Sequence, residues 1–298
     1  MYIHIFSYLC TMKRRKFIQF GTLTTMAAVL PTLRSLATGP ETVEMPVLFI
    51  GHGNPMNAIE LNEFTKSWEA MGKELPRPKA IVVVSAHWET RGTKVTAMKA
   101  PKTIHDFGGF PQALFDVQYP APGNPELAAE IPGLIHAAGV ELDHTWGLDH
   151  GAWSVLKPMF PMADVPVIQL SLDYLKTPAQ HYELGKELSA LRKKGVLVIG
   201  SGNIVHNLGM INWNQPTAGF DWATEFNQLV KNAINDQMPD KLINYQSLSK
   251  GSQLAVPSTE HYLPLLYSIA LRKKDEPVRF FNDSPVMGSL TMTSLRIG

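Results

Sequence analysis

The sequence predicts an α/β fold, namely a single domain with a mostly parallel central sheet flanked by helices. Four short runs rich in Val, Ile and Leu are expected to form strands buried inside such a sheet, and they cover residues 45–50, 80–85, 165–170 and 196–200. Segments with helical periodicity separate these runs, and this alternation predicts a three-layer arrangement. The chain has 298 residues, 45% of them hydrophobic, which suits one sizeable domain.

The helices are predicted from the spacing of apolar residues and from the residues that end helices. In the first helix, Phe64, Trp68 and Met71 share one face and Gly72 ends the helix. Gly139 ends the second helix in the same way. The predicted helices cover residues 59–71, 126–138, a segment that starts near 152, 178–193, 222–235 and 260–270.

The remaining segments predict outer strands and one long loop. Alternating or short apolar runs predict additional strands at residues 94–98, 140–143, 278–282 and 289–297. Residues 103–125 are rich in aromatic residues, Gly and Pro, and carry no regular periodicity. Loops of this length inside a domain usually bind a ligand or cover a site. A surface loop packed on its own side chains is the alternative.

Composition excludes several classes of function. Net charge is +1, and no basic block lies in the body of the chain, so nothing supports nucleic-acid binding. Cys10 is the single cysteine, which excludes an intramolecular disulfide and a cysteine-rich zinc site. Any metal must therefore be held by imidazole or carboxylate groups. The sequence carries no signal for or against an oligomer.

Residues 1–37 have the pattern of a twin-arginine export signal, followed by the predicted domain at 45–298. Arg14 and Arg15 precede an apolar stretch at residues 20–33, and small residues follow at 35–37. We expect export to the periplasm, or alternatively a retained membrane anchor with the domain facing the periplasm. The stretch is short and rich in Thr, so no stable membrane span is expected. Residues 1–11 precede Met12, a second candidate start.

Four histidines follow apolar runs at points where a strand would pass into a loop. They are His52, His87, His206 and His261. In α/β sheets, ligand sites collect at the carboxyl ends of the strands. Several imidazoles at that edge predict a metal site, and an all-imidazole set suits zinc, copper or iron(II). Each histidine taken singly also fits a hydrogen-bonded histidine near a loop.

Two other histidines are candidates for contact with a substrate. His150 follows Asp149 on a glycine-flanked turn and is placed for proton transfer, or else it is a structural turn residue. His105 precedes Asp106 in the aromatic loop and either contacts substrate or has a structural role. Three remaining histidines are expected on exposed faces, namely His136, His144 and His181.

Eight ordered segments resemble the class III extradiol ring-cleavage dioxygenases, and most closely the bacterial group that opens DOPA. They are GHGNPMNAI, PKAIVVVSAHWETRGT, IHDFGGFP, YPAPGNPELA, WGLDHGAW, GSGNIVHNL, EHYLPLLY and MGSLTMTSLRIG. Together they extend from about residue 45 to residue 298. The resemblance implies an α/β fold with a mononuclear non-heme metal site.

On this chain the family's metal-binding histidines fall on His52, His87 and His261, with His206 close to or on the metal. The resemblance implies iron(II) for dioxygenase activity, although members of this kind are often described with zinc. Distant members have a glutamate as last ligand, where this chain has His261. The export signal is a second departure, since the group is generally cytoplasmic.

The implied reaction opens a catechol such as DOPA beside the diol and incorporates both atoms of dioxygen, giving a muconate semialdehyde. His150 and His206 are the acid–base candidates, and neither is favoured over the other. His105, Phe107 and Phe110 are expected to border the ring. The partners are thus a small aromatic diol and dioxygen. Two alternatives on the same scaffold are a zinc-dependent hydrolase and a non-catalytic metal-binding protein.

Overall fold

A computed structural model of the protein describes residues 44–298, and every structural statement below concerns this part of the chain. The export signal and the membrane anchor predicted for residues 1–37 lie outside the described residues. Within residues 44–298, no helix combines the length and the apolar character needed to cross a membrane.

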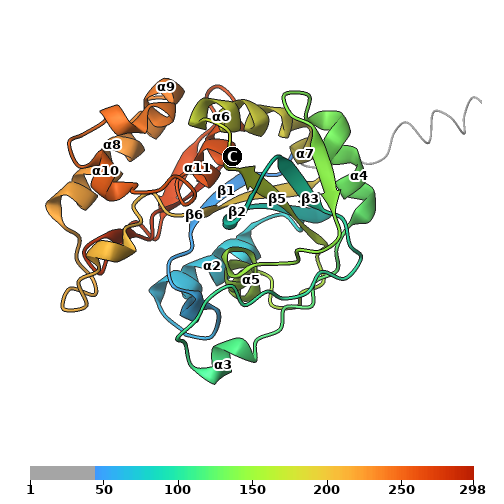
Figure 1. The fold of residues 1–298 in the computed structure, drawn as a ribbon, viewed down its shortest axis with the longest axis horizontal. Coiled ribbons are helices and arrows are strands. Elements are labelled where there is room, and N and C mark those ends of the chain that lie inside the picture. Colours follow the sequence, from blue (N-terminus) through green and yellow to red (C-terminus); the bar gives the residue numbers. More distant parts are fainter. Residues whose placement is uncertain (1–43) are drawn as a thin grey trace, which may run out of the picture. The chain divides into compact units, whose positions relative to one another are not determined.

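The core of the domain is an eight-stranded sheet with the strand order β4-β3-β5-β2-β6-β1-β10-β7 (Figure 1). The four central strands, β5, β2, β6 and β1, are parallel neighbours. Antiparallel pairs flank them, since β3 pairs with β5, and β10 pairs with both β1 and β7. The predicted mostly parallel sheet is therefore confirmed.

The strands are β1 (Val47–Gly51), β2 (Ala80–Thr90), β3 (Thr93–Thr96), β4 (Val140–Asp143), β5 (Val167–Asp173), β6 (Val196–Gly202), β7 (Val278–Phe281) and β10 (Ser294–Ile297). A separate two-stranded sheet pairs β8 (Pro285–Val286) with β9 (Leu290–Thr291). The predicted strand at 289–297 is thus divided between two sheets.

Strand β2 explains why apolar runs without alternation predicted the sheet. Val82 and Val84 face one hydrophobic layer, whereas Ile81 and Val83 face the other. All four side chains are at most 1% exposed. A strand covered on both faces needs apolar residues at every position, which removes the period-two pattern of a half-exposed strand.

Helices cover both faces of the sheet (Figure 1). Helices α2 and α5 contribute to the same hydrophobic layer, and the other layer includes residues of α4, α6, α8 and α11. The α-helices are α2 (Glu63–Glu74), α3 (Gln112–Phe115), α4 (Pro125–Leu134), α5 (His150–Met159), α6 (Pro178–Glu187), α7 (Ser189–Lys193), α8 (Asp221–Asn235), α9 (Pro239–Ile243), α10 (Ser252–Ala255) and α11 (Leu263–Ala270). Short 3-10 helices are η1 (Pro55–Ala58), η2 (Leu208–Met210) and η3 (Tyr245–Ser247).

Several predicted boundaries differ from the structure, and two of the differences move a candidate residue. Strand β2 continues to Thr90 through an irregularity after Val84, so His87 lies inside a strand and not after it. His150 is the first residue of α5, because the Asp149 side chain accepts a hydrogen bond from the Ala152 N–H and caps the helix there. His150 is therefore held by regular structure and does not sit on a free turn.

Other boundaries shift by a few residues. Helix α11 begins at Leu263, with Pro264 in its first turn, so His261 precedes the helix. The predicted helix 178–193 is two helices, α6 and α7, which meet at Leu188. The predicted helix 126–138 ends at residue 134, and the long loop contains the short helix α3. His181, expected to be exposed, is fully buried.

Candidate active site

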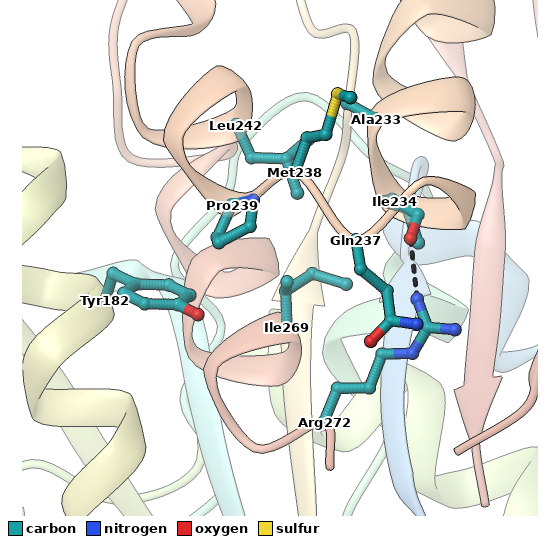
Figure 2. A pocket seen from close by; sticks show the side chains of 9 residues that line it. All are labelled: Tyr182, Ala233, Ile234, Gln237, Met238, Pro239, Leu242, Ile269 and Arg272. Atoms are coloured by element: carbon teal, nitrogen blue, oxygen red, sulfur yellow. Dashed lines mark hydrogen bonds between the residues drawn. The ribbon is translucent and has the colours of Figure 1, made fainter. Parts of the chain in front are cut away.

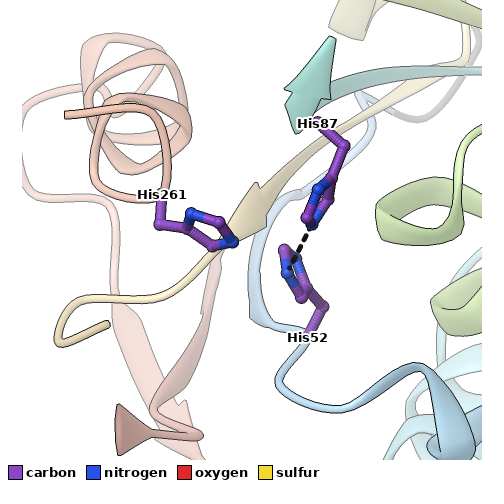
Figure 3. Close-up of side chains that lie close together, drawn as sticks. All are labelled: His52, His87 and His261. Atoms are coloured by element: carbon purple, nitrogen blue, oxygen red, sulfur yellow. Dashed lines mark hydrogen bonds between the residues drawn. The ribbon is translucent and has the colours of Figure 1, made fainter. Parts of the chain in front are cut away.

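Three histidines from separate parts of the chain point their rings toward one another (Figure 3). His52 follows β1, His87 lies in β2, and His261 precedes α11. Their ring centroids are separated by 4.9 Å, 5.2 Å and 5.0 Å. One nitrogen of each ring lies within 4.8 Å of the other two. The structure thus brings together three of the four histidines predicted from the sequence.

His52 is fixed in position and in tautomer by Ser201 at the end of β6. The Ser201 hydroxyl donates its only proton to the Gly151 carbonyl at 2.6 Å. Its oxygen also lies 3.0 Å from Nδ1 of His52, so Nδ1 must be the donor in that contact. The lone pair of His52 is therefore on Nε2, which lies 3.1 Å from Nε2 of His87. Gly53, with φ of 61°, turns the chain directly after the ring.

Carboxylates lie beside the outer nitrogens of the other two rings. Nδ1 of His261 donates to Glu260 at 3.0 Å, and this leaves the lone pair on Nε2. That Nε2 atom is buried and has no hydrogen-bond partner among the residues that the structure describes. Nδ1 of His87 lies 3.6 Å from the Asp106 carboxylate, close enough for attraction but too far for a good hydrogen bond.

These contacts fit a metal ion bound by the three Nε2 atoms. Histidines that bind metal commonly donate their other ring N–H to a carboxylate or another acceptor, and this contact fixes the tautomer. The separation of 3.1 Å between Nε2 of His52 and Nε2 of His87 is close to the ~3 Å between two nitrogens that share one ion at ~2.1 Å. A buried lone pair without a partner, as on His261, is otherwise costly.

The three rings are held in the neutral form. Burial, and then the nearby His150 ring, lowers the pKa of His87 to about 3, against an opposing effect of Asp106. Burial and the neighbouring histidines hold the pKa of His52 and of His261 well below the ordinary value. Neutral imidazole is the form that binds metal.

His150 is oriented by Asp106, which contacts it twice. One carboxylate oxygen accepts from the His150 backbone N–H at 2.9 Å, and the other lies 2.9 Å from Nδ1 of its ring. Burial alone would raise the pKa of Asp106, but hydrogen bonds and charge at His150 lower it overall. A charged Asp106 makes Nδ1 the donor, so the second ring nitrogen of His150 remains for a substrate.

His206 lies beside the three converging rings, in a different cluster. Its ring stacks on that of His261 with centroids 3.5 Å apart and planes 6° apart. Its ring nitrogens group with Glu260 and His261, and not with His52 and His87. Burial lowers its pKa to about 4, against a smaller opposite effect of Glu260. His206 therefore lies on the His261 side of the site.

The histidines border a cavity of about 320 Å³. His150, His206 and the three converging histidines all contribute to its lining, and so does Asp106. The rest of the lining is largely apolar, including Phe107, Phe110, Leu208, Ile211, Trp213 and Met287. A cavity of this size with a few polar groups at one end is typical of a site for a small molecule.

Phe107 and Phe110, which were expected to border the ring, are among the residues that line the cavity. The Phe107 ring is 5.6 Å from the His150 ring in an edge-on arrangement. His105 is not among the lining residues, and its Nε2 donates to the Val117 carbonyl at 3.0 Å. This hydrogen bond joins two parts of the aromatic loop, so His105 has a structural role in stabilising the loop.

Sequence reasoning assigned no role to Asp106, Ser201 and Glu260, which orient the histidines. Glu260 stands next to its partner His261 in the sequence, and that adjacency is a local signal. Asp106 stands next to His105 but orients His150, 44 residues away, so its position in the sequence does not indicate its partner. Ser201 is 149 residues from its partner His52 and gave no such signal. Asp149, whose side chain is fully buried, accepts from Ser85 at 2.7 Å and from Gln169 at 2.6 Å.

A smaller cavity of about 120 Å³ lies elsewhere in the domain (Figure 2). Tyr182, Met238 and Arg272 are among its lining residues. The Arg272 guanidinium is already engaged there, because Nη1 donates to the Ile234 carbonyl at 2.6 Å and Nε donates to the Glu276 carbonyl at 3.0 Å. Among residues 44–298, no histidine or carboxylate side chain lines this cavity, so its chemistry does not match that of the histidine site.

Comparison with known proteins gives consistent results. Residues 46–280 match the family described as the catalytic LigB subunit of aromatic ring-opening dioxygenase. A protein of Escherichia coli K12 named 4,5-DOPA dioxygenase extradiol is 51% identical over 258 residues, which are 85% of this chain and 95% of that protein. A protein of the same name from Beta vulgaris is 36% identical over 79% of this chain and 90% of its own length. The crystal structure of an uncharacterized protein from Escherichia coli K12 matches with a TM-score of 0.75 and 46% identity, covering 85% of this chain and all of that one.

Proposed function

Because this chain belongs to the LigB family of aromatic ring-opening dioxygenases and is an extradiol-type ring-cleavage dioxygenase, we propose that its substrate is a small catechol. DOPA is the first compound to test, since relatives carry it in their names. The proposed product is a muconate semialdehyde that contains both atoms of dioxygen. The observation that carries the proposal is the convergence of three imidazoles, one with a buried and unpartnered Nε2, at one end of an apolar cavity.

One divalent ion bound by His52, His87 and His261 is the proposed cofactor. Iron(II) bound there would bring the diol and dioxygen together and supply the redox chemistry that zinc lacks. An all-imidazole set also accepts zinc, so metal identity decides between ring cleavage and the alternative, hydrolysis. His206 stacks on His261 and is proposed to lie beside the ion.

His150 is the proposed base for the catechol hydroxyl. Asp106 holds its Nδ1 at 2.9 Å, and the side chain lines the cavity within 3.8 Å of the His87 ring centre. A base oriented by a carboxylate next to the metal site is placed to take a proton as the diol binds. His206, the second candidate, has no hydrogen bond to a carboxylate among the described contacts. Phe107 and Phe110 are proposed to flank the aromatic ring.

An oxygen electrode tests this function directly. The protein is loaded with iron(II) without oxygen and then given oxygen and a catechol panel that includes DOPA. We expect oxygen uptake together with the visible absorbance of a semialdehyde. His261→Ala should abolish both signals, and His144→Ala, at an exposed histidine, should retain them. Absence of uptake across the panel would reject ring cleavage, and turnover with zinc without oxygen would favour the hydrolase.

We also propose that residues 1–37 direct the protein to the periplasm by the twin-arginine route. The support is the Arg14-Arg15 pair ahead of an apolar stretch. This route carries folded proteins, which suits a protein loaded with metal before export. Cell fractionation tests the proposal: replacement of both arginines by lysine should leave the protein in the cytoplasm. Wild-type protein that resists extraction from the membrane would favour the anchored alternative.

A further inference from the structure

We propose that the first turn of helix α5 holds two of the metal-binding histidines in position. It does so through Ser85 and Asp149 on one side, and through Gly151 and Ser201 on the other. None of these four residues lines the cavity, so they are positioning residues that act through the histidines. This inference rests on the metal site of the proposed function and adds the groups that determine its geometry.

Ser85 and Ser201 are direct neighbours on adjacent parallel strands, since Ser85 of β2 pairs in register with Ser201 of β6. Both side chains are buried, and both hydroxyls donate to the first turn of α5. Ser85 donates to the Asp149 carboxylate at 2.7 Å, and Ser201 donates to the Gly151 carbonyl at 2.6 Å. Two neighbouring strands of the sheet are therefore joined to one helical turn.

Ser85 links this turn to His87. Its only proton goes to Asp149, so its oxygen is the acceptor for the His87 backbone N–H at 3.2 Å. The pairing of β2 with β5 is irregular between Val84 and Glu89, which is the stretch that carries His87. Where the regular ladder is interrupted, the Ser85 hydroxyl provides a hydrogen-bond partner for the backbone. Asp149 thus influences, through one hydroxyl, where β2 presents the His87 ring.

Asp149 can serve as a fixed acceptor because donors surround both of its oxygens. One oxygen accepts from Ser85 and from the Ala152 N–H, and the other accepts from Gln169 and from the Trp146 indole. Rotation of this buried carboxylate would leave several donors without a partner, which is costly. The position of the Asp149 oxygens is therefore determined by the fold, and Ser85 takes its position from them.

Gly151 allows the turn to approach His87 closely. A Cβ atom at residue 151 would overlap with Oγ of Ser85 and would lie 2.9 Å from Cδ2 of His87. Carbon atoms in contact are normally about 3.5–4.0 Å apart, so any side chain here would displace the ring. The Gly151 carbonyl also holds Ser201, whose oxygen accepts from Nδ1 of His52 at 3.0 Å. Gly151 therefore limits the positions of both rings.

The proposed base lies in the same turn. His150 stands between Asp149 and Gly151 in the chain, and its ring centroid is 3.8 Å from that of His87. A shift of the turn would therefore move the base and the metal-binding rings together. Loss of one support should change the geometry at the ion itself, and this change can be measured without turnover.

Ser85→Ala tests the assignment, because it removes only the hydroxyl between Asp149 and the His87 N–H. Cobalt(II) is bound to metal-free protein without oxygen, and chelator competition measures its affinity. We expect binding about 10- to 100-fold weaker than in the wild type, the usual effect of removing a group that orients a metal-binding histidine. The visible spectrum of bound cobalt(II), which reports the geometry of its ligands, should also change.

Ser154→Ala is the matched control for this variant. Ser154 is a buried serine of the same helix, and its hydroxyl has no hydrogen-bond partner within residues 44–298. We expect it to keep the wild-type affinity and spectrum. Urea unfolding of the metal-free proteins separates the two possible roles of Ser85. Lower stability of Ser85→Ala with wild-type affinity and spectrum would show a structural role only and would overturn the inference.

Gly151→Ala tests the close approach independently of the Ser85 hydroxyl. We expect weaker cobalt(II) binding and an altered spectrum, because the added methyl group displaces the His87 ring. Gly133→Ala in α4 is the control, since a Cβ atom there meets no other atom within 4 Å. Wild-type affinity and spectrum in a folded Gly151→Ala protein would contradict the proposal.

Two double-mutant cycles on cobalt(II) affinity test whether both rings share the turn. Ser85→Ala with Ser201→Ala should weaken binding at least about threefold less than the product of the single effects, because the first change already frees the turn. The control cycle combines Ser201→Ala with Glu260→Ala, which acts on His261 from outside α5. Coupling through the shared ion is present in both cycles, so their difference isolates the turn. Equal coupling in the two would overturn the shared support.

The outcomes also separate this inference from the proposed function. Wild-type metal binding in Ser85→Ala and Gly151→Ala, together with active wild-type enzyme, would overturn the inference and leave ring cleavage intact. A wild-type enzyme that opens no catechol would reject the proposed activity, and the cobalt(II) measurements would still decide the inference. Cobalt(II) binding that persists unchanged in both His52→Ala and His87→Ala would reject the metal site and the inference with it.

Discussion

Glu260 accepts a hydrogen bond from Nδ1 of His261 at 3.0 Å, and the opposite nitrogen of that ring is buried without a partner. The two facts are linked, because the carboxylate accepts but cannot donate and so fixes the proton on Nδ1. Ser201 has the same effect on His52. Glu260 and Ser201 thus determine which nitrogen of the His261 ring and of the His52 ring carries a lone pair toward the cavity.

Glu260→Ala should weaken metal binding by about 10- to 100-fold, the usual effect of removing a group that orients a metal-binding histidine. The His261 ring would lose both its fixed tautomer and its orientation. Chelator competition on the purified protein measures the affinity. Glu225→Ala, which removes an exposed carboxylate from α8, is the control and should bind as the wild type does. Equal affinity of Glu260→Ala and wild type would refute the orienting role.

Removal of the metal should destabilise the protein. An ion present at a hundredfold excess over its Kd contributes ~2.7 kcal/mol of stability. For a domain of this size this corresponds to a fall in Tm of roughly 5–10 °C. Thermal unfolding followed by circular dichroism, with and without chelator, measures the difference. His261→Ala should show little response to the chelator, and an undiminished response in that variant would place the ion elsewhere.

His150→Ala should lower kcat by ~10²- to 10⁴-fold, the usual contribution of a general base, while one metal ion per chain is retained. Asp106→Asn should also lower kcat, because the neutral amide that replaces the carboxylate has no negative charge to hold the proton on Nδ1 of His150. Steady-state kinetics combined with metal analysis separates loss of chemistry from loss of metal. A large loss in His206→Ala with near-normal His150→Ala would transfer the role to His206.

The sequence predicts the sheet and the converging histidines for one physical reason. Strands of a parallel sheet are buried on both faces, so β1, β2 and β6 are continuous apolar runs whose carboxyl ends share one edge. His52 follows β1 and His87 lies near the end of β2. Their proximity is therefore a property of the fold class, and it requires no knowledge of individual contacts.

The contacts that orient the histidines depend on tertiary structure and are not visible in local patterns. The Ser201 contact with His52 and the Asp106 contact with His150 join segments far apart in the sequence. Local patterns also misplaced His150, because the cap formed by Asp149 starts α5 two residues before the predicted start. His181 was expected to be exposed, and its burial depends on the packing of α6 against α11.

His181 gives a prediction for the dependence of stability on pH. It is fully buried, and its Nδ1 lies 3.0 Å from the Tyr267 hydroxyl of α11. Burial lowers its pKa to about 4, against smaller opposite effects of Asp173. The unfolded chain takes up a proton near pH 6.5, whereas the folded chain does so only near pH 4. The unfolded state therefore binds more protons between these values, and acid favours unfolding.

The free energy of unfolding should fall as the pH decreases from about 6.5 to about 4, with His181 contributing on the order of 3 kcal/mol. Urea unfolding of metal-free protein at several pH values measures the slope. His181→Asn retains a polar partner for Tyr267 and should reduce the slope by about one proton, whereas His144→Asn, at an exposed position, should keep it. The histidines of the metal site are present in all three proteins, so their contribution cancels in the comparison. An unchanged slope in His181→Asn would mean that the buried imidazole takes up its proton equally in both states.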